Sequence, residues 1–162
     1  MTLTDLLGNV YTDAVTQAQT ADGHQVHIFY AKSIKAGANT VKASFSGSNN
    51  HPWLAIYEYR GLSVTAPLDQ TAHAQGSSST PNCGPTPTTL NANELIFAGV
   101  ALPSSYTGTA TAGSGYTMVE QDTNTSPADN ETIATTSTGA FTGTFTLSSG
   151  TNWSAVTATF KP

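Results

Sequence analysis

The sequence predicts an all-β fold, an antiparallel β-sandwich of jelly-roll type that forms one domain over residues 1–162. Alternating segments are the first indication. Residues 40–46 place Val41, Ala43 and Phe45 on one side and polar residues on the other, the period of two that a half-buried strand requires. Clusters of Gly, Pro, Asn and Asp separate such segments at regular intervals, which is typical of sandwiches. No segment has the pattern of an amphipathic helix.

After the end of one strand near Leu3 and a Leu-Leu-Gly-Asn turn, the expected strands cover residues 10–17, 25–32, 40–46, 53–59, 68–74, 94–102, 116–122, 131–137, 141–147 and 153–160. Asp22 and Gly23 form a turn of the tight hairpin kind between the first two. Residues 94–102 (ELIFAGVAL) are apolar on both faces, which predicts a central strand with a layer on each side. Residues 76–82 are rich in Gly, Ser and Thr and predict an exposed, mobile connection.

The composition restricts the classes of partner. Only 9% of the residues are charged, the net charge is −5, and the five Lys and Arg residues are scattered. Nucleic-acid binding needs a concentrated basic surface, so we expect no nucleic-acid partner. No apolar run reaches the length of a membrane helix, so we expect no membrane partner. Cys83, the single cysteine, lies in a Ser/Pro/Gly loop and excludes both an intrachain disulfide and a Cys-based metal site.

The expected location is extracellular or at the cell surface. A surface rich in Thr and Ser and poor in charge suits extracellular β-proteins. The first residues, MTLTDLLGN, lack the basic region and long apolar core of a signal peptide. We therefore expect either that the export signal has been removed from this sequence or that the chain is part of a larger exported protein.

Several motifs carry a family resemblance: TDLLGNVYT (4–12), IFYAKSIKAGANTVKASFSG (28–47), LAIYEYRGL (54–62) followed by PLD (67–69), AGSGYT (112–117) and WSAVTATFKP (153–162). Together they resemble an uncharacterised β-sandwich domain of large secreted or surface proteins of environmental bacteria. The resemblance spans nearly the whole chain and implies a fold similar to concanavalin or laminin-G jelly rolls. The motifs are turn and core signatures, and the family supplies no established catalytic residues.

The chain departs from this family at its start. Family members commonly have extra strands before the TD-x-x-GN turn, and this chain lacks them. Such a departure leaves a sheet edge uncovered, and an open edge invites pairing with another chain. The expectation is therefore a shortened sandwich or a homodimer formed through that edge.

Candidate catalytic residues are few. Ser114 lies in Ala-Gly-Ser-Gly-Tyr, an ordinary hairpin turn rather than a nucleophile elbow. Glycoside hydrolysis uses paired carboxylates, and the candidates are Glu58 with Glu120 or Asp122. Glu58 follows an apolar pair on the face that we expect to point inward. The alternative is a structural acid that pairs with Arg60.

One loop is a candidate metal site. The segment from Asp122 to Glu131 offers oxygen ligands of the kind that calcium takes at sandwich rims, with Asp122, Asp129 and Glu131 as candidates. It lacks the spacing of a calcium-binding loop. We therefore expect a solvated loop and no cofactor, with calcium as the alternative.

Aromatic residues provide the candidate binding surface. Trp53, Tyr57 and Tyr59 alternate on one expected strand, and Trp153 opens the last. Rings about 7 Å apart along a strand can stack on successive sugar units. This interpretation requires Leu54 and Ile56 to point into the core while the rings face outward. The alternative is that the rings fill the interior of the sandwich.

The preferred interpretation is a non-catalytic extracellular module that binds a polysaccharide or other glycan at this aromatic face. Two alternatives remain: a small polysaccharide hydrolase that uses Glu58 with Glu120 or Asp122, and a structural or adhesive spacer that associates with itself.

Overall fold

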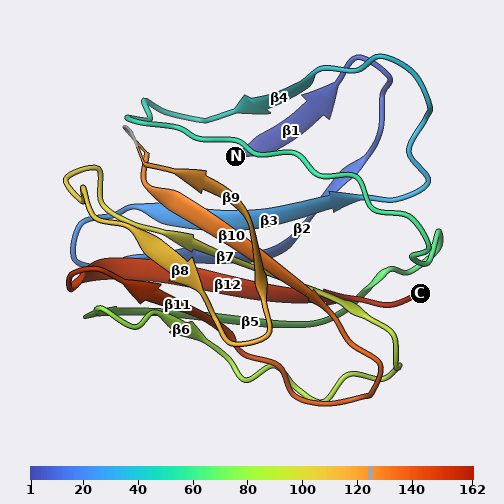
Figure 1. Cartoon of the computed structure of the whole chain (residues 1–162). Helices are drawn as coiled ribbons and strands as arrows, with labels where there is room; N and C mark the ends of the chain where they lie inside the picture. The colour runs from blue at the N-terminus through green and yellow to red at the C-terminus, as the bar shows by residue number, and fades with distance from the viewer. Residues whose placement is uncertain (124–125) are drawn as a thin grey trace.

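A computed structural model describes residues 1–123 and 126–162 of the chain. Its paired strands are antiparallel, and no helix occurs in the residues described. The strands are β1 (Thr2–Asp5), β2 (Tyr11–Ala18), β3 (Gln25–Ala31), β4 (Val41–Ser44), β5 (Leu68–Ser78), β6 (Asn82–Cys83), β7 (Leu95–Ala101), β8 (Ala110–Ala112), β9 (Thr117–Asp122), β10 (Ala128–Ala134), β11 (Gly143–Leu147) and β12 (Thr151–Phe160) (Figure 1). The predicted all-β, antiparallel class is confirmed.

A five-stranded sheet in the order β5-β12-β7-β10-β9 forms the centre of the molecule. Its inner strands β7 and β12 send alternate residues into two different cores. Ala98, Val100 and Ala155 face one core, and Phe97 and Val156 face the other. This confirms the prediction that the apolar strand of residues 94–102 has a layer on each side.

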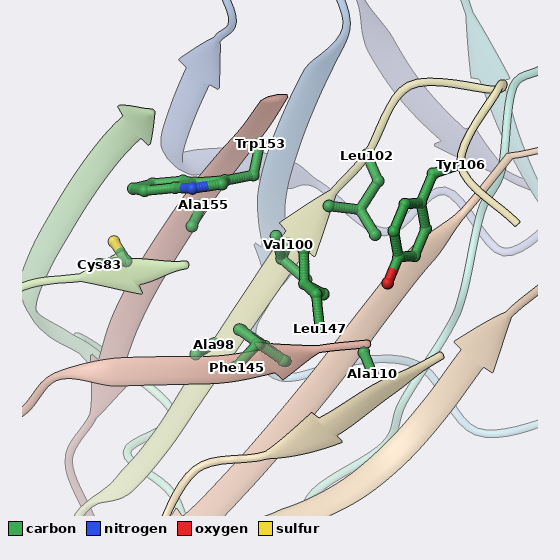
Figure 2. Close-up of a cluster of buried hydrophobic side chains, with 10 residues drawn as sticks. All are labelled: Cys83, Ala98, Val100, Leu102, Tyr106, Ala110, Phe145, Leu147, Trp153 and Ala155. Carbon is green, nitrogen blue, oxygen red and sulfur yellow. The ribbon is translucent and has the colours of Figure 1, made fainter. Parts of the chain in front are cut away.

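The three-stranded sheet β6-β11-β8 covers one face of the central sheet. The side chains buried between the two sheets are shown in Figure 2: Cys83, Ala98, Val100, Leu102, Tyr106, Ala110, Phe145, Leu147, Trp153 and Ala155. Burial of a side chain as large as Phe145 contributes roughly 2 kcal/mol. Cys83 lies inside this core rather than in an exposed loop, and burial raises the pKa of its thiol to about 11.

The hairpin β2–β3 covers the opposite face. Its buried residues Val15 and Ile28 pack against Phe97, Val156, Ala158 and Phe160 of the central sheet. The turn of this hairpin includes Asp22 and Gly23, as predicted, and Gly23 has a φ of 82°. That conformation costs little for a residue without a Cβ.

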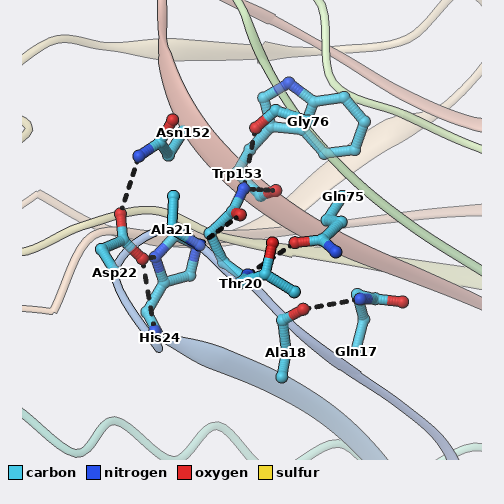
Figure 3. A network of polar contacts seen from close by, with 11 residues as sticks. Gln17, Ala18, Thr20, Ala21, Asp22, His24, Gln75, Gly76, Asn152 and Trp153 are labelled. Carbon is cyan, nitrogen blue, oxygen red and sulfur yellow. Dashed lines mark hydrogen bonds and ion pairs between the residues drawn. The ribbon is translucent and has the colours of Figure 1, made fainter.

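Polar contacts tie the turn of this hairpin to the central sheet (Figure 3). Gln19 is 5% exposed, and its Nε2 donates to the carbonyls of Gly76 at 2.9 Å and Trp153 at 3.0 Å. Asn152 Nδ2 donates to Asp22 Oδ2 at 3.1 Å. The hairpin is therefore fixed at its turn by hydrogen bonds as well as along its length by apolar packing.

Several segments differ from the prediction. The strand expected over residues 131–137 lies three residues earlier, as β10. The strand expected over residues 40–46 shortens to β4, whose only partner among the described strands is β1, in a small sheet at the top of Figure 1. Residues 53–59 are extended but pair with no strand among the residues that are described. Residues 76–82, expected as a mobile connection, instead extend β5 to Ser78 alongside β12 and lead into β6.

The short strands β6 and β8 are not predicted, because two and three residues carry too little pattern. Within the described part of the chain, no helix is long and apolar enough to span a bilayer.

Replacing Gln19 by Leu should lower the free energy of unfolding by about 2 kcal/mol, because the carbonyls of Gly76 and Trp153 then lose their donor inside the protein. Urea denaturation followed by tryptophan fluorescence measures this. Gln25→Leu, at an exposed position of β3, is the matched control and should change stability by less than about 0.5 kcal/mol. Equal losses in the two variants would contradict the role assigned to Gln19.

Candidate functional site

The segment predicted to carry an outward aromatic face has the opposite orientation. Leu54 and Ile56, expected in the core, are 44% and 62% exposed, whereas Trp53 and Tyr57 are half-buried. The centroid of the Tyr57 ring lies 5.2 Å from that of Phe97 on β7. Side chains on both sides of this segment are apolar. The aromatic rings are larger than Leu54 and Ile56, so they remove more apolar surface from water when they are the ones that face the central sheet. The predicted platform on the outer surface is therefore not formed.

The other two predicted aromatic residues differ from each other. Tyr59 is 40% exposed, and its ring centroid lies 6.4 Å from that of Tyr57. Trp153 is a core residue with 7% exposure, and its Nε1 donates to Ser78 Oγ at 3.0 Å. Its indole lies over Gly76, where an added Cβ would come within 2.6 Å of the ring. Trp153 therefore has a packing role, and its ring has no surface to offer a sugar.

The candidate catalytic acids lie at or near the surface. The side chain of Glu58 is 61% exposed, so it points outward rather than inward as expected, and its Oε1 lies 3.7 Å from Nε of Arg60. Glu120 is exposed on β9, and Asp122 is half-buried at the end of the same strand. None of the three acids lines either of the two surface hollows described below.

Glu131 and Asp129, proposed as calcium ligands, are buried on β10. Glu131 is fully buried, and its carboxylate accepts the backbone N–H groups of Gly113 at 2.7 Å and Thr144 at 2.9 Å. Burial raises the pKa of Glu131 to about 7, although both hydrogen bonds oppose this. Asp129 is 4% exposed and accepts a hydrogen bond from Gln121 at 2.8 Å, and burial raises its pKa as well.

Glu131 therefore ties the central sheet to the outer sheet instead of facing solvent. No group of three or more potential metal ligands occurs in residues 1–123 and 126–162. Asn124 and Thr125, in the middle of the loop considered for calcium, lie outside the described residues.

One surface hollow of about 250 Å³ lies beside a second pair of buried acids. Its lining residues are Tyr59, Arg60, Gly61, Leu62, Asn93, Glu94, Leu95 and Ala134. Glu94 is fully buried, and burial together with the neighbouring Asp69 raises its pKa. The Asp69 side chain is 1% exposed, and Lys161 Nζ lies 3.8 Å from its Oδ1. The Asp69–Lys161 contact links the end of the chain to β5, and the sequence gives no sign that Glu94 and Asp69 lie close together.

The other hollow, of about 300 Å³, has a different chemistry. We call it the Tyr30 hollow, and it is lined by Gly8, Asn9, Val10, Thr12, Tyr30, Lys32, Ser33 and Lys35. It lies between the turn after β1 and the end of β3, and no carboxylate lines it. Its amide, hydroxyl and phenol groups can donate and accept hydrogen bonds. The sequence predicts the TDLLGN turn but not that the Lys-Ser-Ile-Lys segment returns beside it.

Asp5 does not line the Tyr30 hollow, but it holds the lining residue Asn9 in place. Its carboxylate accepts from Asn9 N at 2.9 Å, Asn9 Nδ2 at 2.7 Å, Tyr11 Oη at 2.9 Å and Asn39 Nδ2 at 2.8 Å. Loss of surrounding water alone would raise the pKa of Asp5, but the hydrogen bonds from Asn39, Asn9 and Tyr11 outweigh it and hold the pKa well below its usual range. Asn9 Oδ1 in turn accepts the backbone N–H of Lys35 at 2.9 Å.

The free energy of unfolding should fall by roughly 3 kcal/mol as the pH rises from about 4.5 to about 7, through Glu131 alone. The pKa of Glu131 is higher in the folded state, so its protonated form stabilises the fold at low pH. Above the unfolded value of 4.5 the unfolded chain ionises first, and the contribution is lost by the time the pH passes the folded value.

Urea titrations at several pH values for the wild type and Glu131→Gln measure this slope. Glu94 and Asp129 titrate in the same direction, so the difference between the two proteins isolates Glu131. Identical slopes for the two proteins would mean that Glu131 is not the group responsible.

Comparison with known proteins identifies no relative. No protein-family model, curated protein or solved structure matches this chain. The resemblance to a bacterial surface domain therefore stays a prediction, and any function has to be inferred from the chemistry of the two hollows and the exposed segment.

Proposed function

We propose that the protein is a non-catalytic extracellular module of jelly-roll type that binds carbohydrate, and that the glycan binds in the Tyr30 hollow rather than along residues 53–59. The observation that carries this proposal is the lining of the hollow, which combines an amide, hydroxyl groups and an aromatic residue without any carboxylate. Sugars present both hydroxyl groups and apolar C–H faces. Small polar side chains bind the former, and a ring binds the latter.

The arrangement of the hollow favours binding, because hydrogen bonds and ring packing hold its wall in place. The Asp5 hydrogen bonds hold Asn9, and Asn9 holds the backbone at Lys35. Tyr30 packs at a 64° angle against Phe160, with 5.9 Å between ring centroids, which anchors the ring to the core. A site with fixed groups loses less conformational entropy on binding.

The distribution of acids supports a binding module over a hydrolase. A glycosidase needs a general acid whose pKa is raised and which reaches the scissile bond. The acids with raised pKa values are Glu94, Asp129 and Glu131, and each is less than 5% exposed. The exposed candidate Glu58 pairs with Arg60 instead.

Tyr30→Leu should weaken glycan binding by about tenfold, because it removes the flat ring while keeping an apolar contact with Phe160. Two-dimensional NMR titration with a panel of soluble oligosaccharides measures the affinity and locates the site through the amides that shift. Tyr59→Leu is the matched control at a ring outside the hollow and should leave the affinity unchanged. Shifts centred on residues 53–60, or no shifts with any saccharide, would refute the proposal.

A second candidate function is self-association, and one specific observation favours it. Leu54, Ile56 and Val64 are 44%, 62% and 64% exposed along a stretch whose residues 53–60 are extended and pair with no strand in the described part of the chain. Unpaired extended backbone with apolar side chains is a template for strand addition. The partner would be the same segment of a second copy of this chain.

Ile56→Lys should abolish such a dimer, because the added charge would be buried at its centre. Sedimentation velocity at increasing protein concentration reports the mass. Leu90→Lys, at a position 71% exposed outside this segment, is the control and should leave the dimer intact. Self-association is refuted if the wild-type protein stays monomeric over a 100-fold range of protein concentration.

A further inference from the structure

We propose that the saccharide bound in the Tyr30 hollow is anionic, a sugar unit that carries a carboxylate or a sulfate ester, and that Lys32 and Lys35 bind its charged group. This inference rests on the proposed carbohydrate function and narrows it to a class of ligand.

The cations of this protein are few, and those in the hollow lack acidic partners. The chain contains five Lys and Arg residues. Arg60 lies 3.7 Å from Glu58, and Lys161 lies 3.8 Å from Asp69. Across residues 1–123 and 126–162, the other three cations, Lys32, Lys35 and Lys42, form no ion pair. Two of these three line the same hollow, and no carboxylate lines it.

Backbone carbonyls orient the two ammonium groups without neutralising them. Lys35 Nζ donates to the carbonyl of Leu7 at 2.7 Å, and Lys32 Nζ donates to the carbonyl of Thr65. An ammonium group has three donors, so each lysine keeps two for a ligand. A hydrogen bond to an ionised oxygen is stronger than one to a neutral carbonyl. An anionic oxygen is therefore a better acceptor than either carbonyl.

The segment between the two lysines has an unusual backbone. Ser33 has a φ of 51°, a left-handed conformation that residues with a side chain rarely adopt. Its Oγ donates to the carbonyl of Val64 at 2.9 Å, which holds this conformation. On the other side, an added Cβ at Gly8 would lie 3.6 Å from Lys35 Nζ, so the turn passes close beneath that ammonium group. Strained backbone held by its surroundings is common where a ligand is bound.

The same features disfavour other anions. A nucleic acid is bound through many phosphate contacts, and two lysines are too few for it. The net charge of −5 repels densely charged anionic polymers at long range. At physiological salt this repulsion is screened beyond about 8 Å. A glycan with one charge per sugar unit can place that charge at the lysines while Asn9, Thr12 and Ser33 contact its hydroxyl groups.

Calorimetric titration with matched pairs of oligosaccharides tests the inference. Suitable pairs are oligogalacturonate and its methyl ester, oligomannuronate and its methyl ester, and a sulfated galactan oligomer and its desulfated form. At least one anionic member should bind more than tenfold more tightly than its neutral counterpart. Its affinity should fall as salt rises from 50 to 500 mM, because the contact is ionic.

Three variants locate the effect. Lys35→Gln and Lys32→Gln should each weaken binding of the anionic member by about tenfold, the size of one hydrogen bond to a charged group. Lys42→Gln, which removes the third unpaired lysine from β4, should leave it unchanged. If Lys35→Gln loses its fold because the bond to Leu7 is gone, Lys32→Gln still provides the test.

Two outcomes would overturn the inference and are distinguishable. If each neutral sugar binds as well as its anionic partner and shifts the resonances of the hollow, carbohydrate binding stands and the anionic class is wrong. If no saccharide of either kind binds, the proposed function fails together with the inference.

Discussion

The structure depends on a central sheet that is buried on both faces. Strands β7 and β12 alternate between two cores, so neither covering layer can be lost without exposing one of them. The layers also approach each other closely. An added Cβ at Gly143 of β11 would lie 2.4 Å from the Cβ of Ala98 on β7 and 2.8 Å from Oγ1 of Thr157 on β12. Small residues on the facing strands therefore determine how closely the two sheets pack.

Each covering layer is also held by one buried polar side chain that accepts or donates two backbone hydrogen bonds. Glu131 accepts from the outer sheet at Gly113 and Thr144, and Gln19 donates from the β2–β3 hairpin to the central sheet. Apolar packing has little directional preference, whereas these bonds have a defined geometry. They determine how the layers are aligned, while the apolar cores supply most of the driving force.

The sequence predicts the central strand over residues 94–102 and the β2–β3 hairpin well, because both depend on local pattern and turn chemistry. It does not determine which way residues 53–59 face. Both alternating sets are apolar there, and the decision comes from Phe97, a residue about forty positions away. The end of β5 lies in the low-complexity stretch after Gln75, whose residue types do not predict a strand. Gly76 fits there because it has no side chain to collide with the Trp153 ring, a contact that the local sequence does not show.

The candidate sites were harder to predict than the fold. The partners of Glu131 are backbone N–H groups. Every residue except proline has such a group, so the residue types do not reveal these partners. The Tyr30 hollow joins two segments whose relation is visible only through the Asp5–Asn9–Lys35 hydrogen bonds. In both cases the chemistry arises from tertiary proximity between residues that individually look like ordinary turn or strand positions.

The buried acids also change how the molecule behaves as a particle in solution. The formal charge of −5 treats every carboxylate as ionised, but Glu94, Asp129 and Glu131 hold their protons more tightly than free side chains do. In mildly acidic surroundings neighbouring molecules therefore repel each other less than the composition implies.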